Sequence, residues 1–202
     1  YEPSLGTRAG ANKPNILDAD VVAVLRRKLD EMCEDIRIFA EQVNGFEPRP
    51  TATLHPVSYF DGAEQIAPGS VDLLVTSPPY LNNYHYIRNT RPHMFWLDMI
   101  AAPSELKAME QKSFGQFWQT VRSGPEIPLV VDHPELRTLL ATLRRRNREK
   151  GPYGGEGWAN YAAAYFNDCD RFCETTLRLM APGGTVVVVI GNNILQGVEF
   201  AT

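Results

Sequence analysis

Cysteine is scarce in this sequence, and no long hydrophobic run is present. The three cysteines, Cys33, Cys169 and Cys173, are too few to build a disulfide framework. Cys169 and Cys173 stand four residues apart on an expected helix, and no histidine lies beside them, which favours two buried thiols over a metal site. No apolar run reaches the roughly 18 residues of a membrane-spanning helix, and the amino end lacks a signal-peptide pattern. We therefore expect a soluble, cytoplasmic protein with no membrane partner.

A strongly basic composition is also missing. The formal net charge is −4 at pH 7, which excludes a uniformly basic nucleic-acid-binding protein. Any contact with nucleic acid must therefore come from a local patch. The 202 residues have an ordinary apolar and charged content, so we expect one α/β domain, or most of one, with a hydrophobic core of its own.

The most informative segment is residues 71–80, with the sequence VDLLVTSPPY. Its apolar run is short and partly β-branched, which is typical of a buried parallel strand. Pro78 and Pro79 end that strand because they cannot donate to a ladder, and they keep the residues before them extended. Ser77, Tyr80 and several backbone carbonyls then meet at the carboxyl edge of an open α/β sheet, where such sheets bind ligands. We expect the site there.

Residues 76–80, TSPPY, resemble motif IV of the amino-methyltransferases. These S-adenosylmethionine-dependent enzymes methylate N4 of cytosine or N6 of adenine in DNA, and the serine version is more typical of the N4-cytosine branch. About a hundred residues further on, residues 181–189, APGGTVVVV, resemble the turn and fifth strand of Rossmann-like methyltransferases. The alternative is that the motif merely ends a strand in another α/β protein. The resemblance spans roughly residues 52–202, with an unmatched insert.

The resemblance implies an α/β fold with a Rossmann-like class I methyltransferase sheet, incomplete in this chain, and a helical insertion. It implies S-adenosylmethionine as the cofactor and double-stranded DNA, with the target base flipped out, as the partner. The Ser77 hydroxyl and the Pro78 carbonyl would accept protons from the amino group and aim its lone pair. Pro79 belongs to the same catalytic motif, and Tyr80 would stack on the base. Methylation of N4 of cytosine is favoured over N6 of adenine.

Cofactor contacts are expected at Asp61 and Gly62, and at Ser77. In these methyltransferases an acidic residue follows the third strand, and Asp61 is placed similarly after an expected strand at residues 52–60. Asp-Gly is also a common turn, which is the alternative. The glycine-rich cofactor loop and the final antiparallel strand pair of the family are not found in this sequence. Either those parts lie outside the sequence given, or another polypeptide supplies them.

Two segments are candidates for contact with DNA. Residues 82–88, NNYHYIR, follow the motif and include Asn82, Asn83, Tyr84 and Arg88, which suit a pocket for an extruded base. The alternative is a polar loop leading into a helix at residues 93–100. The second segment has five cations in seven residues, at the end of a helix that we expect Asp132 to cap. A phosphate-binding patch is favoured over a simple helix terminus, and its members are Arg144, Arg145, Arg146, Arg148 and Lys150.

The remaining segments define the organisation. Residues 18–44 carry an apolar heptad seam, which predicts a long helix that contacts a partner subunit or a second copy, or that lies across its own domain. We expect three regions: residues 1–50 with this helix, a methyltransferase core at 51–102 and 158–202, and a helical insertion at 103–157 that carries target recognition. Within them, 103–122 and 161–180 have helical spacing, 151–158 reads as a mobile lid or a linker, and 186–190 as a strand buried on both faces.

Two other functions are compatible with the same motif. One is a methyltransferase that acts on RNA or on a protein amide. Another is a non-catalytic, methyltransferase-like subunit that works through the heptad helix. The sequence itself does not separate these from DNA methylation.

Overall fold

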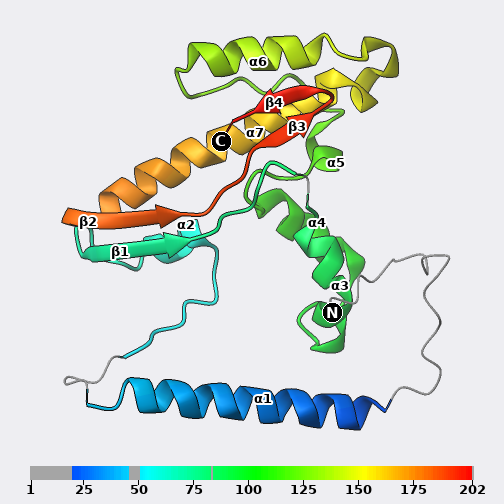
Figure 1. Ribbon diagram of the computed structural model, residues 1–202. Coiled ribbons are helices and arrows are strands. Elements are labelled where there is room, and N and C mark those ends of the chain that lie inside the picture. Colours follow the sequence, from blue (N-terminus) through cyan, green and yellow to red (C-terminus); the bar gives the residue numbers. More distant parts are fainter. Residues whose placement is uncertain (1–19, 46–50, 83, 202) are drawn as a thin grey trace. The chain divides into compact units, whose positions relative to one another are not determined.

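The structure is a computed structural model that describes residues 20–45, 51–82 and 84–201. It is a mixed α/β fold with a small parallel sheet (Figure 1). The chain divides into two compact units, Tyr1–Pro56 and Val57–Thr202. The expected insertion and the expected core therefore belong to the same unit, and the boundary between the two units follows Pro56.

The first unit contains the long helix α1, Val21–Gln42, which confirms the prediction from the heptad seam. The side chain of Asp20 caps its start by accepting a hydrogen bond of 2.9 Å from the amide of Ala23. Gly45 follows its end with a φ of +99°, in the left-handed region that suits glycine. No residue of α1 is buried, so its apolar seam is exposed.

The second unit contains the sheet. Strand β1, Val71–Thr76, pairs in parallel with β2, Met180–Val188, as the motif strand and the later valine run predict. The pairing is interrupted, because Val71 lies opposite Met180 but Leu73 lies opposite Thr185. The Pro-Gly-Gly turn occupies this bulge, where Gly183 has a φ of +83°.

The prediction that these strands are buried on both faces is wrong. Leu73 is 59% exposed and Val75 64% exposed, and the valines from Val186 to Val189 are 38–55% exposed. A parallel strand is buried only where further strands and helices flank it. In the described ranges this sheet has two strands, so its apolar side chains remain accessible.

The core of the second unit lies around helix α7, Gly155–Leu179. Helix α6, Pro134–Arg144, packs beside it through Leu136, Leu140 and Leu143. The first turn of α7 and the 3₁₀ helix η1, Arg148–Tyr153, replace the expected lid or linker. Gly154, Gly155 and Gly157 are buried because neighbouring backbone segments approach closely. A Cβ on Gly155 would collide with the carbonyl oxygen of Leu143.

Several boundaries differ from the predictions. The expected strand at residues 52–60 is instead an irregular segment followed by the short helix α2, Tyr59–Ala63, because Ser58 caps a helix there through its Oγ. The expected helix at 93–100 is α3, Tyr86–Trp96, which begins earlier because His85 caps it. The expected helix at 103–122 breaks into α4, Pro103–Lys112, and α5, Trp118–Val121.

Two further corrections concern the carboxyl half. Helix α6 is capped by His133 and not by Asp132, which instead forms an ion pair of 3.0 Å with Arg137. A β-hairpin that was not expected follows β2 and consists of β3, Asn193–Leu195, and β4, Val198–Phe200. Its turn has positive φ angles at Gln196 and Gly197, as two-residue hairpin turns require. Among the described residues, no helix has the length and apolar character to cross a bilayer.

Candidate functional site

The motif lies at the carboxyl ends of β1 and β2. Ser77 follows β1 directly, and its Oγ is 3.1 Å from the hydroxyl oxygen of Tyr80. Gly191 follows β2 at the same edge of the sheet, and a methyl group built on it would lie 3.9 Å from the Tyr80 ring. The segments that follow the two strands therefore meet at the same edge of the sheet.

The backbone carbonyls of the motif differ in their partners. Pro79 accepts a hydrogen bond of 3.0 Å from the hydroxyl of Tyr165 on α7, and Tyr80 accepts one of 2.7 Å from the amide of Asn82. Burial raises the pKa of Tyr165, so its phenol remains a donor. The Pro78 carbonyl accepts no hydrogen bond from any residue that the structure describes. It is available, together with the exposed hydroxyl of Ser77, to an external donor.

A cavity of about 210 Å³ lies beside the motif. Its walls are mainly aromatic, and they come from the motif loop, the start of α3, the link between α4 and α5, and α7. The lining residues are Pro79, Tyr80, Tyr84, Tyr86, Ser113, Phe114, Gln116, Phe117 and Tyr161. The structure thus brings Tyr80 and Tyr84 of the predicted site to one space and adds residues of the predicted insertion.

The wall formed by Tyr84 and Tyr86 is held by local hydrogen bonds. The side chain of Asn82 accepts a bond of 3.1 Å from the amide of Tyr84, and Tyr84 packs edge-on against Tyr86 with ring centroids 4.7 Å apart. Both tyrosines are more than 40% exposed. Exposed rings at the rim of a cavity present stacking surfaces to a planar ligand.

His85 connects this wall to the insertion. Its Nδ1 accepts a 3.0 Å hydrogen bond from the amide of Arg88, its Nε2 is 3.4 Å from Glu110, and its ring stacks on Phe117 with centroids 3.7 Å apart. Burial lowers the pKa of His85, which favours the neutral ring that this cap requires. The histidine therefore fixes the relative positions of α3, α4 and the Phe117 segment.

The other predicted base contacts lie at the surface. Asn82 and Arg88 are exposed, and neither lines the aromatic cavity. Asn83 lies outside the described residues. Arg88 and Asn82 therefore reach the cavity only indirectly, through the backbone and side-chain bonds that they make with His85 and Tyr84.

The predicted cofactor residues differ in what they offer. Asp61 is exposed on α2, and its carboxylate is hydrogen-bonded to no described residue. Gly62 is buried, and its amide donates to Ser58 within the helix, so it has no free donor for a ligand. The neighbouring Phe60 stacks on Phe114 with centroids 6.1 Å apart, which places α2 next to the wall of the aromatic cavity. The Asp61 carboxylate and the Ser77 hydroxyl are therefore accessible to an external ligand, whereas the Gly62 amide is not.

The predicted basic patch separates into two parts. Arg144 points inward: its guanidinium lies 3.1 Å from Asn160 Oδ1 and 3.2 Å from Glu126. Arg145, Arg146 and Arg148 are exposed, as is Lys150, and no ion pair to these four is found in the described part of the chain. Arg144 stabilises the packing of α6 on α7, and the four exposed cations remain available for phosphate groups.

Residues of the site that the sequence did not reveal are Tyr165, Tyr161, Phe114, Gln116 and Phe117. Phe114 and Phe117 fall within residues 103–122, where the spacing of apolar residues predicts one helix and not a cavity wall. Gln116 has a φ of +52°, which no local pattern indicates. These residues reach the motif only through tertiary packing.

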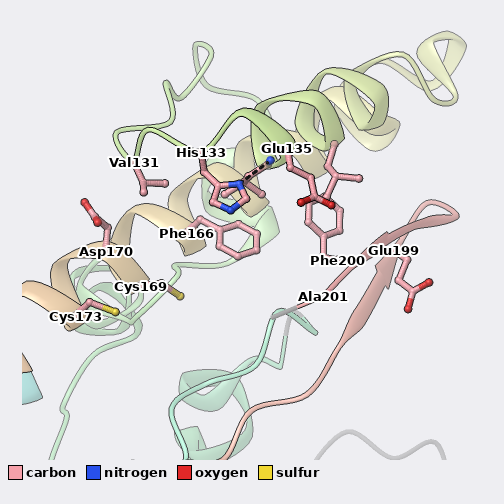
Figure 2. Close-up of a pocket in the computed structure, with 12 residues that line it drawn as sticks. Val131, His133, Glu135, Phe166, Cys169, Asp170, Cys173, Glu199, Phe200 and Ala201 are labelled. Atoms are coloured by element: carbon pink, nitrogen blue, oxygen red, sulfur yellow. Dashed lines mark hydrogen bonds between the residues drawn. The ribbon is translucent and has the colours of Figure 1, made fainter. Parts of the chain in front are cut away.

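A second cavity, of about 540 Å³, lies between α6, α7 and β4 and contains none of the motif residues (Figure 2). Cys169 and Cys173 lie along one side of it, and His133 lies on the other. Burial raises the pKa of the Cys169 thiol to about 12, so it is protonated at neutral pH and a poor nucleophile. His133 uses its Nδ1 to cap α6. Within the described ranges, no group of three metal-ligating side chains is found.

The motif therefore combines a Pro78 carbonyl that is unpaired among the described residues and an exposed Ser77 hydroxyl with an adjacent aromatic cavity, at the edge of the sheet that the sequence indicates. A scan against protein-family models, a search of curated proteins and a search of solved structures find no match to this chain.

Proposed function

We propose that this protein is a DNA methyltransferase that transfers a methyl group from S-adenosylmethionine to the exocyclic amino group of a flipped base. N4 of cytosine is favoured over N6 of adenine. The observation that carries the proposal is the pairing of two accessible acceptors with an aromatic cavity lined by Tyr80. The acceptors are the Pro78 carbonyl, which has no hydrogen-bond partner among the described residues, and the exposed Ser77 hydroxyl, which contacts the Tyr80 hydroxyl. We further infer that β1 and β2 belong to a Rossmann-like class I methyltransferase sheet.

In the proposed reaction the protein contributes mainly by positioning the reacting groups. The amino nitrogen of cytosine or adenine is a poor nucleophile, because its lone pair is delocalised into the ring. Hydrogen bonds from its two N–H groups to Ser77 Oγ and the Pro78 carbonyl would draw the nitrogen toward a tetrahedral shape. The methylated nitrogen is strongly acidic and would release one proton to water, while Ser77 and Pro78 accept hydrogen bonds from its N–H groups. When bound, S-adenosylmethionine supplies an electrophilic methyl group.

Two parts of the chain support the DNA substrate. Rings at the rim of the cavity, Tyr84 and Tyr86, can stack on a base that has left the duplex. The four exposed cations, Arg145, Arg146, Arg148 and Lys150, provide a local positive surface on a protein whose net charge is −4. Such a surface contacts the phosphate backbone without reading its sequence.

The test is nucleoside mass spectrometry on unmodified DNA incubated with the protein and S-adenosylmethionine. We expect N4-methylcytosine or, less favoured, N6-methyladenine. Ser77→Ala should lower turnover about 100-fold, because it removes one oriented dipole at the reacting nitrogen, and Tyr80→Ala about 10- to 100-fold through lost stacking. Both variants should keep the circular dichroism spectrum and thermal midpoint of the wild type.

The control is Ser123→Ala, since Ser123 is an exposed serine away from the cavity. Wild-type turnover in both motif variants would refute the assignment. Cofactor binding without a modified base would move the substrate to RNA or to a protein amide.

A second function is favoured by α1. Its exposed seam includes Leu25, Leu29, Ile36 and Phe39, each at least 50% exposed. A helix of this kind suits a methyltransferase-like subunit that acts by binding a second chain. A protein that binds neither S-adenosylmethionine nor DNA, but associates through α1, would support this function over catalysis.

A further inference from the structure

Gln116 stands out among the polar groups of the aromatic cavity. Apart from the tyrosine hydroxyls, the polar side chains that line it are those of Ser113 and Gln116. Ser113 donates its hydroxyl proton to the Met109 carbonyl at 3.0 Å. The carboxamide of Gln116 makes no hydrogen bond to any residue that the structure describes. It therefore brings an uncommitted donor and an uncommitted acceptor to the cavity.

The backbone of Gln116 is held in an unfavourable conformation. Its φ of +52° lies in the left-handed region, which costs a residue with a side chain about 1 kcal/mol or more. Such a conformation persists only where the surroundings impose it. Strain of this kind gathers at sites that bind ligands, so its position in the cavity wall points to function.

Contacts on the amino-terminal side of Gln116 impose the conformation. The amide of Gly115 donates a hydrogen bond of 2.7 Å to Asp168 Oδ2 on α7. A Cβ on Gly115 would lie 2.7 Å from the Tyr165 ring, so only glycine fits against it. The same Tyr165 holds the Pro79 carbonyl of the motif. One side chain of α7 therefore positions both the motif and the Gln116 segment.

Contacts on the carboxyl-terminal side complete the support. Phe117 is almost fully buried and stacks on His85, and its amide donates to Thr120 Oγ1 at 3.2 Å. Gln116 itself donates its amide to the Ser113 carbonyl at 2.9 Å. The segment is thus fixed on both sides, and binding need not first order it.

We propose that Gln116 is a specificity-determining residue that hydrogen-bonds the Watson–Crick edge of the nucleobase held in the aromatic cavity. This rests on the proposed function, in which Ser77 and Pro78 accept from the exocyclic amino group. Cytosine and adenine carry an unprotonated ring nitrogen next to that group, and the carboxamide N–H of Gln116 donates to it. Thymine presents a carbonyl to the two acceptors, which refuse it, and an N–H at the adjacent ring position, which Gln116 could meet only by turning its carboxamide.

The test is an NMR titration of the 202-residue chain with deoxycytidine, deoxyadenosine and thymidine. We expect deoxycytidine or deoxyadenosine to shift both the aromatic signals of the cavity and the side-chain amide signal of Gln116, and thymidine to shift them less. Gln116→Glu replaces the donor by an acceptor and should weaken binding of the favoured nucleoside about tenfold. Thymidine binding should stay the same or strengthen, because the carboxylate can accept from the thymine ring N–H. Its matched control is Gln119→Glu, since Gln119 is exposed and does not line this cavity.

A second variant guards against misfolding. Gln116→Gly suits the left-handed backbone, so it should keep or raise the thermal midpoint. Its preference over thymidine should fall to the part that Ser77 and Pro78 provide. The inference would be overturned if the aromatic signals shift without the side-chain amide signal of Gln116. It would also be overturned if both Gln116 variants bind the favoured nucleoside as tightly as the wild type. Either outcome would leave the proposed function standing. If no nucleoside shifts the aromatic signals, the base pocket itself fails, and the proposed function fails with it.

Discussion

Asp168 illustrates, at the scale of a single residue, how the cavity wall depends on a half-buried carboxylate. Its Oδ2 accepts the amide of Gly115 at 2.7 Å, which anchors the segment that leads to Gln116. Asp168→Ala would leave that amide without a partner, and we expect a loss of about 1–3 kcal/mol in the free energy of unfolding. Asp168→Asn keeps an acceptor in place and should unfold at nearly the wild-type urea concentration. Equal losses in the two variants would show that the hydrogen bond from the Gly115 amide does not account for the lost stability.

The same residue predicts a pH dependence. Burial raises the pKa of Asp168, and the Gly115 amide and Arg171 only partly oppose this. A raised pKa means that the folded state binds the proton more readily than the unfolded state, so lowering the pH stabilises the folded protein at this site. Urea unfolding from pH 7 down to the acid range should therefore show wild type gaining stability relative to Asp168→Asn. If the wild type instead loses stability relative to Asp168→Asn as the pH falls, the raised pKa assigned to the buried Asp168 carboxyl would be contradicted.

At this scale, the sequence predicts the residues that act through local pattern. Ser77, Pro78 and Tyr80 are recognisable because a strand, two prolines and an aromatic ring are contiguous in the chain. Tyr165 and Gln116 are not recognisable, since their role depends on which helix packs beside the motif. Arg144 shows the converse error. Its neighbours in sequence suggest a phosphate contact, whereas Asn160 and Glu126 hold it inside.

At the scale of elements, the contact between α6 and α7 depends on the absence of a side chain at Gly155. A Cβ there would overlap the carbonyl oxygen of Leu143, and backbone atoms cannot move aside as a flexible side chain can. We expect Gly155→Ala to destabilise the protein by about 1–3 kcal/mol or more, as overpacking does. Thermal and urea unfolding monitored by circular dichroism would measure this loss.

The matched control is Gly124→Ala. A Cβ at Gly124 would have only an ordinary contact, 3.5 Å from the Val121 carbonyl, and its backbone is not left-handed. It should change stability by less than about 0.5 kcal/mol. A small loss at Gly155 would mean that α6 and α7 can separate without cost, and that the glycines at residues 154–157 serve motion instead of packing.

Elements with strong periodicity were predicted well, and elements that depend on glycine or proline were not. The apolar faces of α1, α6 and α7 repeat at helical spacing, so their helices follow from the sequence. Residues 151–158 were misjudged because glycine serves both flexible loops and close contacts, and only the position of Leu143 decides between them. The irregular segment before α2 was misjudged because Ser58 offers a helix cap that an apolar strand pattern conceals.

At the scale of the whole molecule, burial was the property that the sequence predicted least well. The valine run of β2 reads as a central strand, and its pairing with β1 is parallel as expected. Whether such a strand is buried depends on the strands and helices that flank its faces and edges. The sequence of the strand itself does not specify those neighbours. The exposed valines are therefore consistent with the local pattern and contradict only the inference about surroundings.

The heptad helix leads to the last prediction, which concerns association. Along the α1 seam, Leu25, Leu29 and Met32 are 57%, 50% and 49% exposed, and the outward faces carry ion pairs such as Arg37 with Glu34 at 2.7 Å. Surface pairs of this kind stabilise a helix only weakly, so α1 gains most from burying its seam. We expect two copies of the chain to associate through α1, with a dimer mass in light scattering.

Leu29→Glu tests this because it places a charge in the middle of the seam. Each copy would lose the burial of one leucine, about 1.5–3 kcal/mol, so the dimer dissociation constant should rise at least about 100-fold. The control is Arg27→Gln, which changes the charge by the same amount on the outward face, where Arg27 lies 3.9 Å from Glu31. A wild type that remains monomeric at high concentration would contradict self-association. The seam would then bind a different chain or lie across its own domain, because an apolar stripe of this length is rarely left in water.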